Sequence, residues 1–393
     1  MKVLHVSLTD AGGGASIAMQ RLHRQLLSKG VESMILTMNK KTIDSTVLYV
    51  PDLYRFKDRV YFFFQKVLRR FTNLKHRTYI FSVLKRLDFD IIHLHWIEDD
   101  YGDMLSLRDL KSINKPIVIS LHDCVSFTGG CHFYNCNGQQ ENCSGCPMKQ
   151  YHATSHKSFK LKERWYSILK PYFVAPSRWI QNVALHSQLL ARHYVACISH
   201  GIDTKLFYPI SKIEARRILG YNENDIVLLA GAVSTIDEIK GMSELPQILF
   251  EIKQAYPNRN VMMICFGKAD VKMEGIDYIG SLSSETDMRV LYNAADVMLV
   301  PSKQESFGLT TEEAMSCGTP VVVYNNTGMV DMIQHRISGY VAQRGNIDDF
   351  VCGVKACIDN KELGRNARKM IEEQFDGDKT VLEYISLYNR IKN

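Results

Sequence analysis

One stretch, residues 297–323, constrains the fold of this chain more than any other. The apolar run 297–300 predicts a buried strand, a helical pattern over 309–316 follows, and a second apolar run, 321–323, comes after a Gly and a Pro. Strand, loop, helix and strand in quick succession are typical of a parallel α/β sheet. Ligands of such sheets bind at the carboxyl ends of strands and at helix N-termini, so the loop of this stretch is a candidate binding site.

Two glutamates mark this candidate site. Glu305 lies in the loop and Glu313 lies in the helix, with seven residues between them. Carboxylates at such a place can accept hydrogen bonds from the vicinal hydroxyls of a sugar or ribose. They can also stabilise positive charge that develops at a sugar carbon. The alternative is a solvated helix face that carries Glu312 and Glu313.

Length and composition bound the class of protein. The chain has 393 residues, which is enough for two domains of ordinary size. With 46% hydrophobic and 23% charged residues it reads as globular rather than disordered or fibrous. A net charge of +6 is mildly basic and does not by itself imply nucleic acid.

The apolar runs and the cysteines indicate where the protein works. No secretory signal is visible at the start, and no apolar run approaches the roughly 18–20 residues of a spanning helix, so we expect a cytoplasmic location. Five of the ten cysteines crowd into residues 124–146. In a cytoplasmic protein this clustering favours a metal or local redox site over a disulfide framework.

A glycine-rich loop joins the first predicted strand, 3–8, to the first predicted helix, 17–28. It contains Asp10 and then Gly12 to Gly14. Backbone N–H groups in such a loop can approach a phosphate, helped by the helix dipole, although a tight turn that needs small residues explains the loop equally well. It is not a dinucleotide fingerprint, and the chain has no Walker A motif.

Residues 54–86 are dense in aromatic, Lys and Arg residues. A basic, aromatic helix can lie on an anionic membrane surface, which predicts peripheral contact with the inner face of a membrane. The alternative is a helix whose aromatic rings pack on its domain and whose charges are solvated. Single-stranded nucleic acid also suits this composition, but no other feature supports it, so we expect no nucleic-acid partner.

Histidines end two of the predicted strands. His93 and His95 alternate with apolar residues, which favours packed or hydrogen-bonded rings over metal ligands. His122 and Asp123 fall at the carboxyl end of the predicted strand 116–121, where α/β folds build their active-site clefts.

The chain's most unusual segment holds four closely spaced cysteines, Cys131, Cys136, Cys143 and Cys146. Cys143 and Cys146 have the spacing of a metal half-site, and four thiolates can complete a tetrahedral structural zinc site. Two disulfides or four unpaired thiols are the alternatives.

The glutamate stretch supports a family assignment. Its sequence Glu-Ser-Phe-Gly-Leu-Thr-Thr-Glu-Glu-Ala-Met-Ser-Cys-Gly-Thr-Pro-Val-Val, from Glu305 onwards, resembles the donor-site signature of retaining glycosyltransferases of family 4. Further motifs resemble the family over residues 198–341: the crossover 198–209, with His200 in place of the usual Asn, the Lys240-Gly241 pair, and the Tyr-x-Ala-Ala-Asp run that ends at Asp296. The Cys-rich loop resembles only a subgroup found among bacterial surface-polysaccharide transferases.

The resemblance implies the GT-B fold, an α/β architecture of two Rossmann-like domains that face each other across a cleft. Residues 1–203 would form the acceptor-binding domain with the Cys-rich loop 124–147, residues 204–376 the nucleotide-sugar donor domain, and residues 377–393 a helix that crosses back. The implied reaction is a metal-independent, retaining transfer of a sugar from a nucleotide-diphosphate sugar to a glycan or lipid-linked acceptor in bacterial polysaccharide synthesis.

The same resemblance assigns roles to residues. Glu313 would bind the ribose, Glu305 the donor sugar, Lys240 the leaving phosphate and His122 the sugar, which makes His122, Glu305 and Lys240 the expected catalytic residues. The other expected donor contacts are Gly13, Gly14, Gly267, Ser306, Phe307, Gly308, Leu309 and Thr310, and the expected acceptor contacts are Asp10 and Asp123.

The sequence departs from the family at one diphosphate contact. Relatives place an Arg near Ala232 that is absent here, so Ser234 or Thr235 is the candidate replacement. This leaves two rival functions open, a non-catalytic sugar- or lipid-binding scaffold and a GT-B phosphorylase. A nucleotide-sugar epimerase lacks support for its acid–base set.

Overall fold

The chain folds into two compact units, which we describe separately. The computed structural model describes residues 1–50, 79–99, 102–103, 105, 107–133, 142–144, 155–234, 238–268, 271–282 and 284–392. The first unit comprises Met1–Pro176, Ile180–Ile198 and Val381–Asn393, and the second comprises Ser177–Trp179 and Ser199–Thr380. The expected boundaries followed residues 203 and 376. Ile202 and Asp376, which pair in a parallel bridge, both lie in the second unit.

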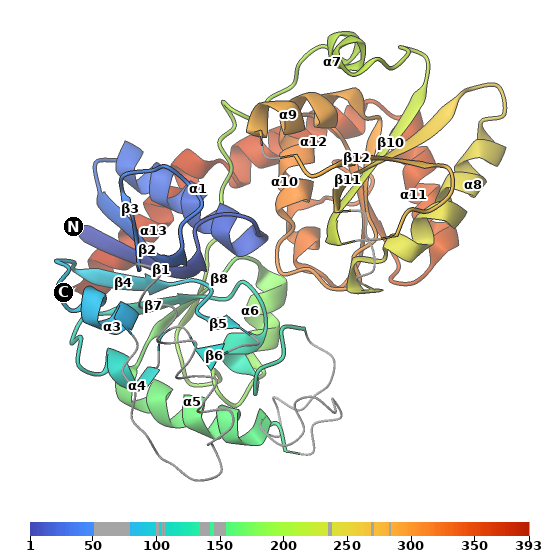
Figure 1. The fold of residues 1–393 in the computed structure, drawn as a ribbon. Helices are drawn as coiled ribbons and strands as arrows, with labels where there is room; N and C mark the ends of the chain where they lie inside the picture. Colours follow the sequence, from blue (N-terminus) through green and yellow to red (C-terminus); the bar gives the residue numbers. More distant parts are fainter. Residues whose placement is uncertain are drawn as a thin grey trace. The chain divides into compact units, whose positions relative to one another are not determined.

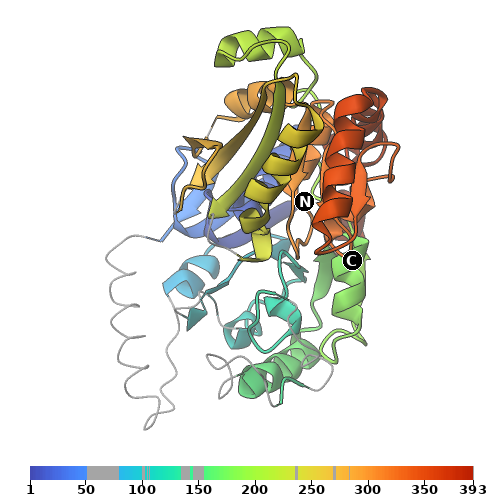
Figure 2. The same cartoon turned by 90° about the vertical axis from the view of Figure 1, so that its right-hand side faces the viewer.

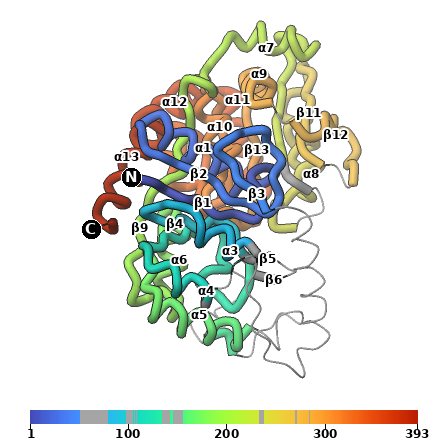
Figure 3. The backbone as a smooth tube through the Cα atoms, turned by 60° about the vertical axis from the view of Figure 1, so that its left-hand side comes forward, coloured from blue at the N-terminus to red at the C-terminus, as the bar shows by residue number. Residues whose placement is uncertain are grey.

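The first unit is built on a parallel sheet of seven strands in the order β3-β2-β1-β4-β7-β8-β9 (Figure 1). The strands are β1 (Lys2–Thr9), β2 (Glu32–Asn39), β3 (Val47–Tyr49), β4 (Ile91–Leu94), β7 (Ile117–Ser120), β8 (Tyr172–Ala175) and β9 (Val195–Cys197). Its helices are α1 (Gly14–Ser28), α3 (Tyr79–Leu84), α4 (Leu107–Leu110), α5 (Ser155–Leu169) and α6 (Arg178–Leu185), and a small antiparallel pair joins β5 (Glu98–Asp99) to β6 (Gly102–Asp103). Crossovers between parallel strands place helices over the sheet, as in Figure 3, where α1 lies against β1 and β2.

The last helix, α13 (Gly377–Lys392), completes the core of the first unit. Its buried residues Val381, Tyr384, Leu387, Tyr388 and Ile391 pack in one cluster with Val3, Ile91, Val118 and Val174 of the sheet. Polar contacts join both ends of the chain as well, because the backbone N–H of Lys2 and the ammonium of Lys392 both donate to the Asp90 carboxylate, at 2.8 and 2.9 Å. This helix is therefore held by apolar burial and by charge.

The second unit contains a parallel sheet of six strands in the order β12-β11-β10-β13-β14-β15. The strands are β10 (Ile226–Ser234), β11 (Val261–Lys268), β12 (Ile276–Gly280), β13 (Val297–Val300), β14 (Val321–Tyr324) and β15 (Tyr340–Ala342). Its helices are α7 (Lys212–Leu219), α8 (Leu245–Ala255), α9 (Glu285–Ala294), α10 (Leu309–Ser316), α11 (Ile347–Asp359) and α12 (Glu362–Gln374), with a short helical turn η3 (Glu238–Lys240) after β10. In Figure 2 the yellow helix α8 lies over this sheet.

Both faces of the second sheet are covered, and strand β10 shows why its sequence is a continuous apolar run. Ile226, Leu228 and Ala230 point into the cluster that includes residues of α8 and α11. Val227 and Leu229, which alternate with them, point into the cluster that includes residues of α9, α10 and α12. A strand buried on both faces needs apolar residues at every position.

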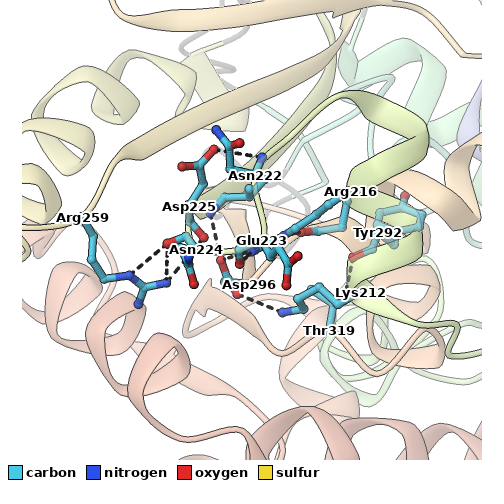
Figure 4. Close-up of polar contacts among 12 residues, drawn as sticks. Lys212, Arg216, Asn222, Glu223, Asn224, Asp225, Arg259, Tyr292, Asp296 and Thr319 are labelled. Carbon is cyan, nitrogen blue, oxygen red and sulfur yellow. Dashed lines mark hydrogen bonds and ion pairs between the residues drawn. The ribbon is translucent and has the colours of Figure 1, made fainter.

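A buried ionic cluster ties α7 to this sheet (Figure 4). The carboxylate of Asp296, just before β13, accepts hydrogen bonds from the Arg216 guanidinium at 2.7 Å, the Lys212 ammonium at 2.9 Å and the Val227 backbone N–H at 2.9 Å. Arg216 also donates to the carbonyl oxygens of Ala294 and Glu223. Because the hydrogen bonds of this cluster in the described part of the chain stay within the fold, we assign it a structural role.

No helix in the described part of the chain is both long and apolar enough to cross a membrane.

Candidate functional site

The glutamate loop of the second unit lies between β13 and α10. Gly308 precedes α10 with a φ of 97°, in the region that L side chains rarely adopt. A Cβ at this position would also lie 2.6 Å from Cγ of Met329. The sequence therefore needs a glycine here to turn from the strand directly into the helix.

Three contacts fix the loop's backbone. The Ser177 hydroxyl donates to the carbonyl oxygen of Ser306 at 2.6 Å, and the N–H of Gly328 donates to that of Glu305 at 2.7 Å. Phe307 is 2% exposed and meets the ring of His200 edge-on, with centroids 4.9 Å apart. The loop is thus held from segments far away in the sequence, which the sequence alone does not reveal.

Lys240 and Glu305 meet in this unit. The Lys240 ammonium donates to Oε2 of Glu305 at 2.5 Å, and the two side chains are 27% and 23% exposed. Gly241 makes this approach possible, because a Cβ there would lie 2.0 Å from the carbonyl oxygen of Pro301. A cation and a carboxylate that water can still reach are suited to a charged, hydroxylated ligand.

Glu313 lies on α10, about one helix turn after Leu309, the first residue of that helix, and it is 7% exposed. The hydroxyl of Tyr292, a fully buried residue of α9, donates to its Oε2 at 2.7 Å. Tyr292 is in turn held by the Thr319 hydroxyl, which donates to its carbonyl oxygen at 2.7 Å. Tyr292 was not expected to take part in the site, although it is the tyrosine of the Tyr-x-Ala-Ala-Asp run.

The remaining expected donor contacts of this unit lie on backbone at strand and helix ends. Leu309 and Thr310 are the first two residues of α10, where helix N–H groups lack intrahelical partners and favour negative charge. Gly267 lies near the end of β11 with a φ of 110°. Leu309 and Thr310, together with Ser306 to Gly308, directly follow Glu305 in the chain, so their backbone N–H groups lie near the Lys240–Glu305 pair.

The glycine-rich loop belongs to the first unit. Gly13 immediately precedes α1 and Gly14 is its first residue, so the helix starts earlier than its apolar pattern suggests. Asp10 is fully buried and accepts hydrogen bonds from the backbone N–H groups of Lys41 and Thr42 and from the Thr42 hydroxyl, at 2.7, 3.0 and 2.5 Å. The Asp10 carboxylate therefore fixes the loop after β2, and its expected contact with an acceptor stays a prediction.

His122 and Asp123 follow β7 in the same unit. Nε2 of His122 lies 3.0 Å from Nδ1 of His95, and burial lowers the pKa of His122 to about 4. The Asp123 carboxylate contacts Nδ1 of His132 at 2.8 Å and accepts a hydrogen bond from the N–H of Val125 at 2.8 Å. His122 is thus a neutral ring at pH 7, while Asp123 is held in place by a second histidine.

A small pocket opens beside these residues. Aliphatic and aromatic side chains line it together with imidazole, hydroxyl and carboxylate groups, and these polar groups suit a hydroxylated ligand. Its lining residues are His95, Trp96, Ile97, Leu107, Ile119, Ser120, His122, Asp123, Val125, Ser126 and Tyr166.

Two of the predictions fall wholly or largely outside the described residues. Cys136 and Cys146 lie there, so the zinc site stays a prediction, while Sγ of the described Cys143 accepts a hydrogen bond from the N–H of Gly129 at 3.2 Å. Of the basic, aromatic segment 54–86, only residues from 79 onwards are described, and the membrane contact also stays a prediction.

The structure thus gathers the expected residues into two sets. Lys240, Glu305, Glu313 and the α10 N-terminus lie in the second unit. His122, Asp123, Asp10 and the glycine loop lie in the first.

Comparisons with known proteins agree with this division. The family described as Glycosyltransferase Family 4 matches residues 12–206, and the family described as Glycosyl transferases group 1 matches residues 215–374. The two matches therefore cover most of both units.

Individual relatives are about a quarter identical to this chain over the residues that align. The D-inositol 3-phosphate glycosyltransferase of Geodermatophilus obscurus is 25% identical over 233 residues, 54% of this chain and 52% of the relative. The N-acetyl-alpha-D-glucosaminyl L-malate synthase of Bacillus anthracis is 26% identical over 204 residues, 49% of this chain and 53% of the relative. The match spans about half the length of these relatives.

Among solved structures, HepE of Anabaena in complex with UDP superposes with a TM-score of 0.67 at 16% identity, covering 99% of this chain and 100% of that one. At this identity the likeness shows the fold. With two parallel-sheet Rossmann-like units and matches to both glycosyltransferase families, the chain belongs to the glycosyltransferases of the GT-B fold, with family 4 character in its N-terminal half.

Proposed function

We propose that this protein transfers a sugar, with retention of anomeric configuration, from a nucleotide-diphosphate sugar to a hydroxyl of a glycan or lipid-linked acceptor. The bond between the anomeric carbon and the diphosphate breaks, and the nucleoside diphosphate leaves with the electron pair. The acceptor oxygen bonds to that carbon on the same face, and its proton passes to a phosphate oxygen. The observation that carries the proposal is the Lys240–Glu305 pair beside the N-terminus of α10.

Lys240 supplies what the leaving group needs. Departure of the diphosphate places negative charge on its oxygen, and a fixed cation lowers the energy of that transition state. Because the Lys240 ammonium and the first N–H groups of α10 already provide positive charge, the proposed step calls for no metal ion. In the structure Glu305 pairs with Lys240 and neutralises its charge. When the donor binds, its phosphate replaces Glu305 as the acceptor of the Lys240 ammonium. Glu305 can then accept hydrogen bonds from the sugar hydroxyls.

Glu313 suits the ribose. Its Oε2 is fixed by the Tyr292 hydroxyl, which leaves the orientation of the carboxylate determined before any ligand arrives. A carboxylate can accept two hydrogen bonds from the vicinal 2′ and 3′ hydroxyls. The UDP bound to the Anabaena relative supports a nucleoside diphosphate as the ligand of this unit.

The first experiment is thermal stabilisation by UDP, GDP, ADP and CMP, because binding at 100 times the dissociation constant adds about 2.7 kcal/mol. We expect one diphosphate nucleotide to raise the melting temperature of the native chain and not that of Glu313→Gln. Asp349→Asn is the matched control, because Asp349 also accepts a hydrogen bond from a buried tyrosine hydroxyl, at 2.7 Å from Tyr340, outside the candidate site. No shift with any nucleotide contradicts the donor site and favours the scaffold function.

The reaction itself is tested with sugars of the base that binds. We expect transfer that persists in excess EDTA, and a product whose anomeric proton shows the donor's configuration by NMR. Activity that requires inorganic phosphate indicates a phosphorylase instead. An inverted product contradicts the retaining mechanism.

A further inference from the structure

Three histidines of the first unit, His5, His95 and His122, form a hydrogen-bonded row, the histidine file, which ends at the expected catalytic residue His122. Nδ1 of His5, on β1, lies 2.9 Å from Nε2 of His95, directly after β4. Nδ1 of His95 lies 3.0 Å from Nε2 of His122, directly after β7. Each of the two contacts therefore pairs an Nδ1 with an Nε2, and His95 joins His5 to His122 through its two different ring nitrogens.

A neighbouring ring, His93, does not belong to the file. The ring nitrogens of His5, His93 and His95 come within 4.8 Å of one another, which raises the question of a metal. His93, however, already contacts the Tyr388 hydroxyl through Nδ1 at 2.7 Å and the Ser120 hydroxyl through Nε2 at 2.8 Å. Both nitrogens of His95 also have ring partners. Hydrogen bonding therefore accounts for these rings without a metal.

The file can carry its protons in only two consistent ways. A neutral imidazole has one N–H and one lone pair, so each contact needs a donor on one side and an acceptor on the other. Burial holds the pKa of His5 well below its usual value and lowers that of His122 to about 4, so both rings are neutral at pH 7. With a single proton on His95 as well, either every ring donates toward His122, or every ring donates toward His5.

The buried end of the file distinguishes these two states. His5 is fully buried, and its Nε2 has no hydrogen-bond partner in the described part of the chain. If the rings donate toward His5, this nitrogen carries an N–H with no acceptor. If they donate toward His122, it holds only a lone pair. Orphaned buried N–H groups are the rarer of the two in proteins, so donation toward His122 is favoured.

We propose that His5 and His95 are positioning residues that hold His122 in the tautomer with its proton on Nδ1. In this state Nε2 of His122 accepts from His95, and Nδ1 offers an N–H. If the proposed glycosyl transfer is correct, on which this role depends, His122 donates a hydrogen bond to an oxygen of the substrate sugar. It does not act as a base toward it.

The tautomer can be read directly by NMR. The full chain labelled with ¹⁵N-histidine gives two-bond correlations between ring protons and ring nitrogens, which separate the protonated from the bare nitrogen. The His122 signals are those missing from His122→Asn. At pH 7.5 we expect protonated Nδ1 and bare Nε2. A proton on Nε2, or on both nitrogens, overturns the proposal whether or not the protein transfers sugars.

Variants of His95 separate positioning from packing. His95→Phe keeps a ring but removes both hydrogen bonds, whereas the His95→Asn amide can still donate from near the Nδ1 position. We expect His95→Phe to give a mixture of His122 tautomers and about a tenfold fall in kcat, with the donor KM within about twofold, and His95→Asn to recover most of the rate. An unchanged His122 tautomer in His95→Phe overturns the proposal.

The matched control is His23→Gln. His23 is also buried and bonded through both ring nitrogens, to the hydroxyls of Ser33 and Thr46 at 2.7 and 2.8 Å, but it lies outside the file. Its loss should lower stability without changing the His122 tautomer or kcat by more than about twofold. An equal loss of kcat in His23→Gln and His95→Phe would mean that His95 matters only for folding. If His95→Phe does not fold, the native spectrum and His95→Asn still decide the tautomer.

Discussion

The two units build their polar sites in opposite ways. In the first unit, His5, His95 and His122 are bonded to one another through their ring nitrogens, and burial lowers the pKa of His5 and His122 so that these two rings are neutral at pH 7. In the second, Lys240 and Glu305 are oppositely charged and about a quarter exposed. Charge is costly to bury but acts strongly on a phosphate, while a neutral donor can be buried cheaply when its partners are fixed. The comparison teaches that one unit offers an accessible ion pair, which suits a charged, hydroxylated ligand, and the other offers uncharged ring nitrogens, which suit hydroxyls.

Burial separates two ion pairs within the second unit. Arg216 is 3% exposed and its partner Asp296 is 18% exposed by side chain, whereas Lys240 and Glu305 remain accessible. The accessible pair can exchange its partner for a ligand, and the buried one cannot without unfolding α7.

The largest effect should come from removing the accessible cation. Lys240→Ala should lower kcat by about a hundredfold or more, because a transition-state charge loses its fixed counter-charge. Lys240→Arg should lie between Lys240→Ala and the native chain, since the guanidinium keeps the charge but not the geometry. Lys369→Ala is the control, because the Lys369 side chain is 70% exposed and pairs only loosely with Glu373. Steady-state kinetics with the donor that binds provides the measurement. An unchanged kcat in Lys240→Ala would contradict a role for the Lys240 charge in the reaction.

Removing the partner of the buried cation Arg216 should lower stability rather than activity. Asp296→Ala leaves the Arg216 guanidinium buried beside a missing partner, which should lower the free energy of unfolding of the second unit by about 3 kcal/mol. Lys212→Met removes the 44% exposed partner of the same carboxylate and should cost less than about 1 kcal/mol. Urea denaturation followed by circular dichroism compares the two variants. Equal losses would contradict the distinction between the buried and exposed partners.

Acid should weaken the first unit before the second. Burial lowers the pKa of His23 and His122 to about 4 and that of His93 to about 3, from 6.5. The unfolded chain therefore binds more protons than the folded one below pH 6.5. Stability is complete above that pH and falls as pH drops toward 4, with each such ring adding at most about 1.4 kcal/mol per pH unit.

The second unit behaves differently in this range. The pKa of Asp296 is lowered by its cationic neighbours Lys212 and Arg216, against the effect of burial, so its contribution is lost only as pH falls below about 4. Pulse hydrogen exchange with mass spectrometry after equilibration in urea, at pH 7 and pH 5, reports the two units separately. Parallel loss in both units would show that the buried histidines do not set the difference. His23→Gln should make the loss in the first unit shallower.

The smallest effect is expected from removing an uncharged hydrogen-bond donor, the Tyr292 hydroxyl, from the site that contains Glu313. Tyr292→Phe removes the hydroxyl that donates to Glu313, so the nucleotide should bind about five- to tenfold more weakly while the fold persists. Tyr340→Phe is matched to it, because this buried tyrosine donates to Asp349 outside the site. Isothermal titration with the nucleotide gives both dissociation constants. Equal affinity in Tyr292→Phe and the native chain would mean that Glu313 is oriented by other contacts.

Much of the candidate site in the second unit could be predicted from the sequence, because the pattern of strand, loop and helix around it is strong. The strand at 297–300 and the helix at 309–316 lie where their apolar patterns predicted them. Glu305 and Glu313 lie in the loop and the helix of this stretch, as the motif predicted, although the contact of Glu313 with Tyr292 was not predicted. The histidines of the first unit were harder to interpret. The alternation around His93 and His95 predicted packed or hydrogen-bonded rings, which the structure confirms, but it did not indicate that His95 contacts His122.

What the sequence determined by itself is whatever depends on neighbouring residues: the alternation of strands and helices, the glycine at position 308 and the glutamate motif that identifies the family. The tertiary structure decided which distant side chains meet: Tyr292 with Glu313, Lys240 with Glu305, and His5 with His95 and His122. The physical reason is packing between elements that are far apart in the chain, which no local pattern specifies. The parallel sheet lays β1, β4 and β7 side by side and so brings the histidines together, whereas α9 and α10 pack on the same face of the second sheet and so bring Tyr292 to Glu313.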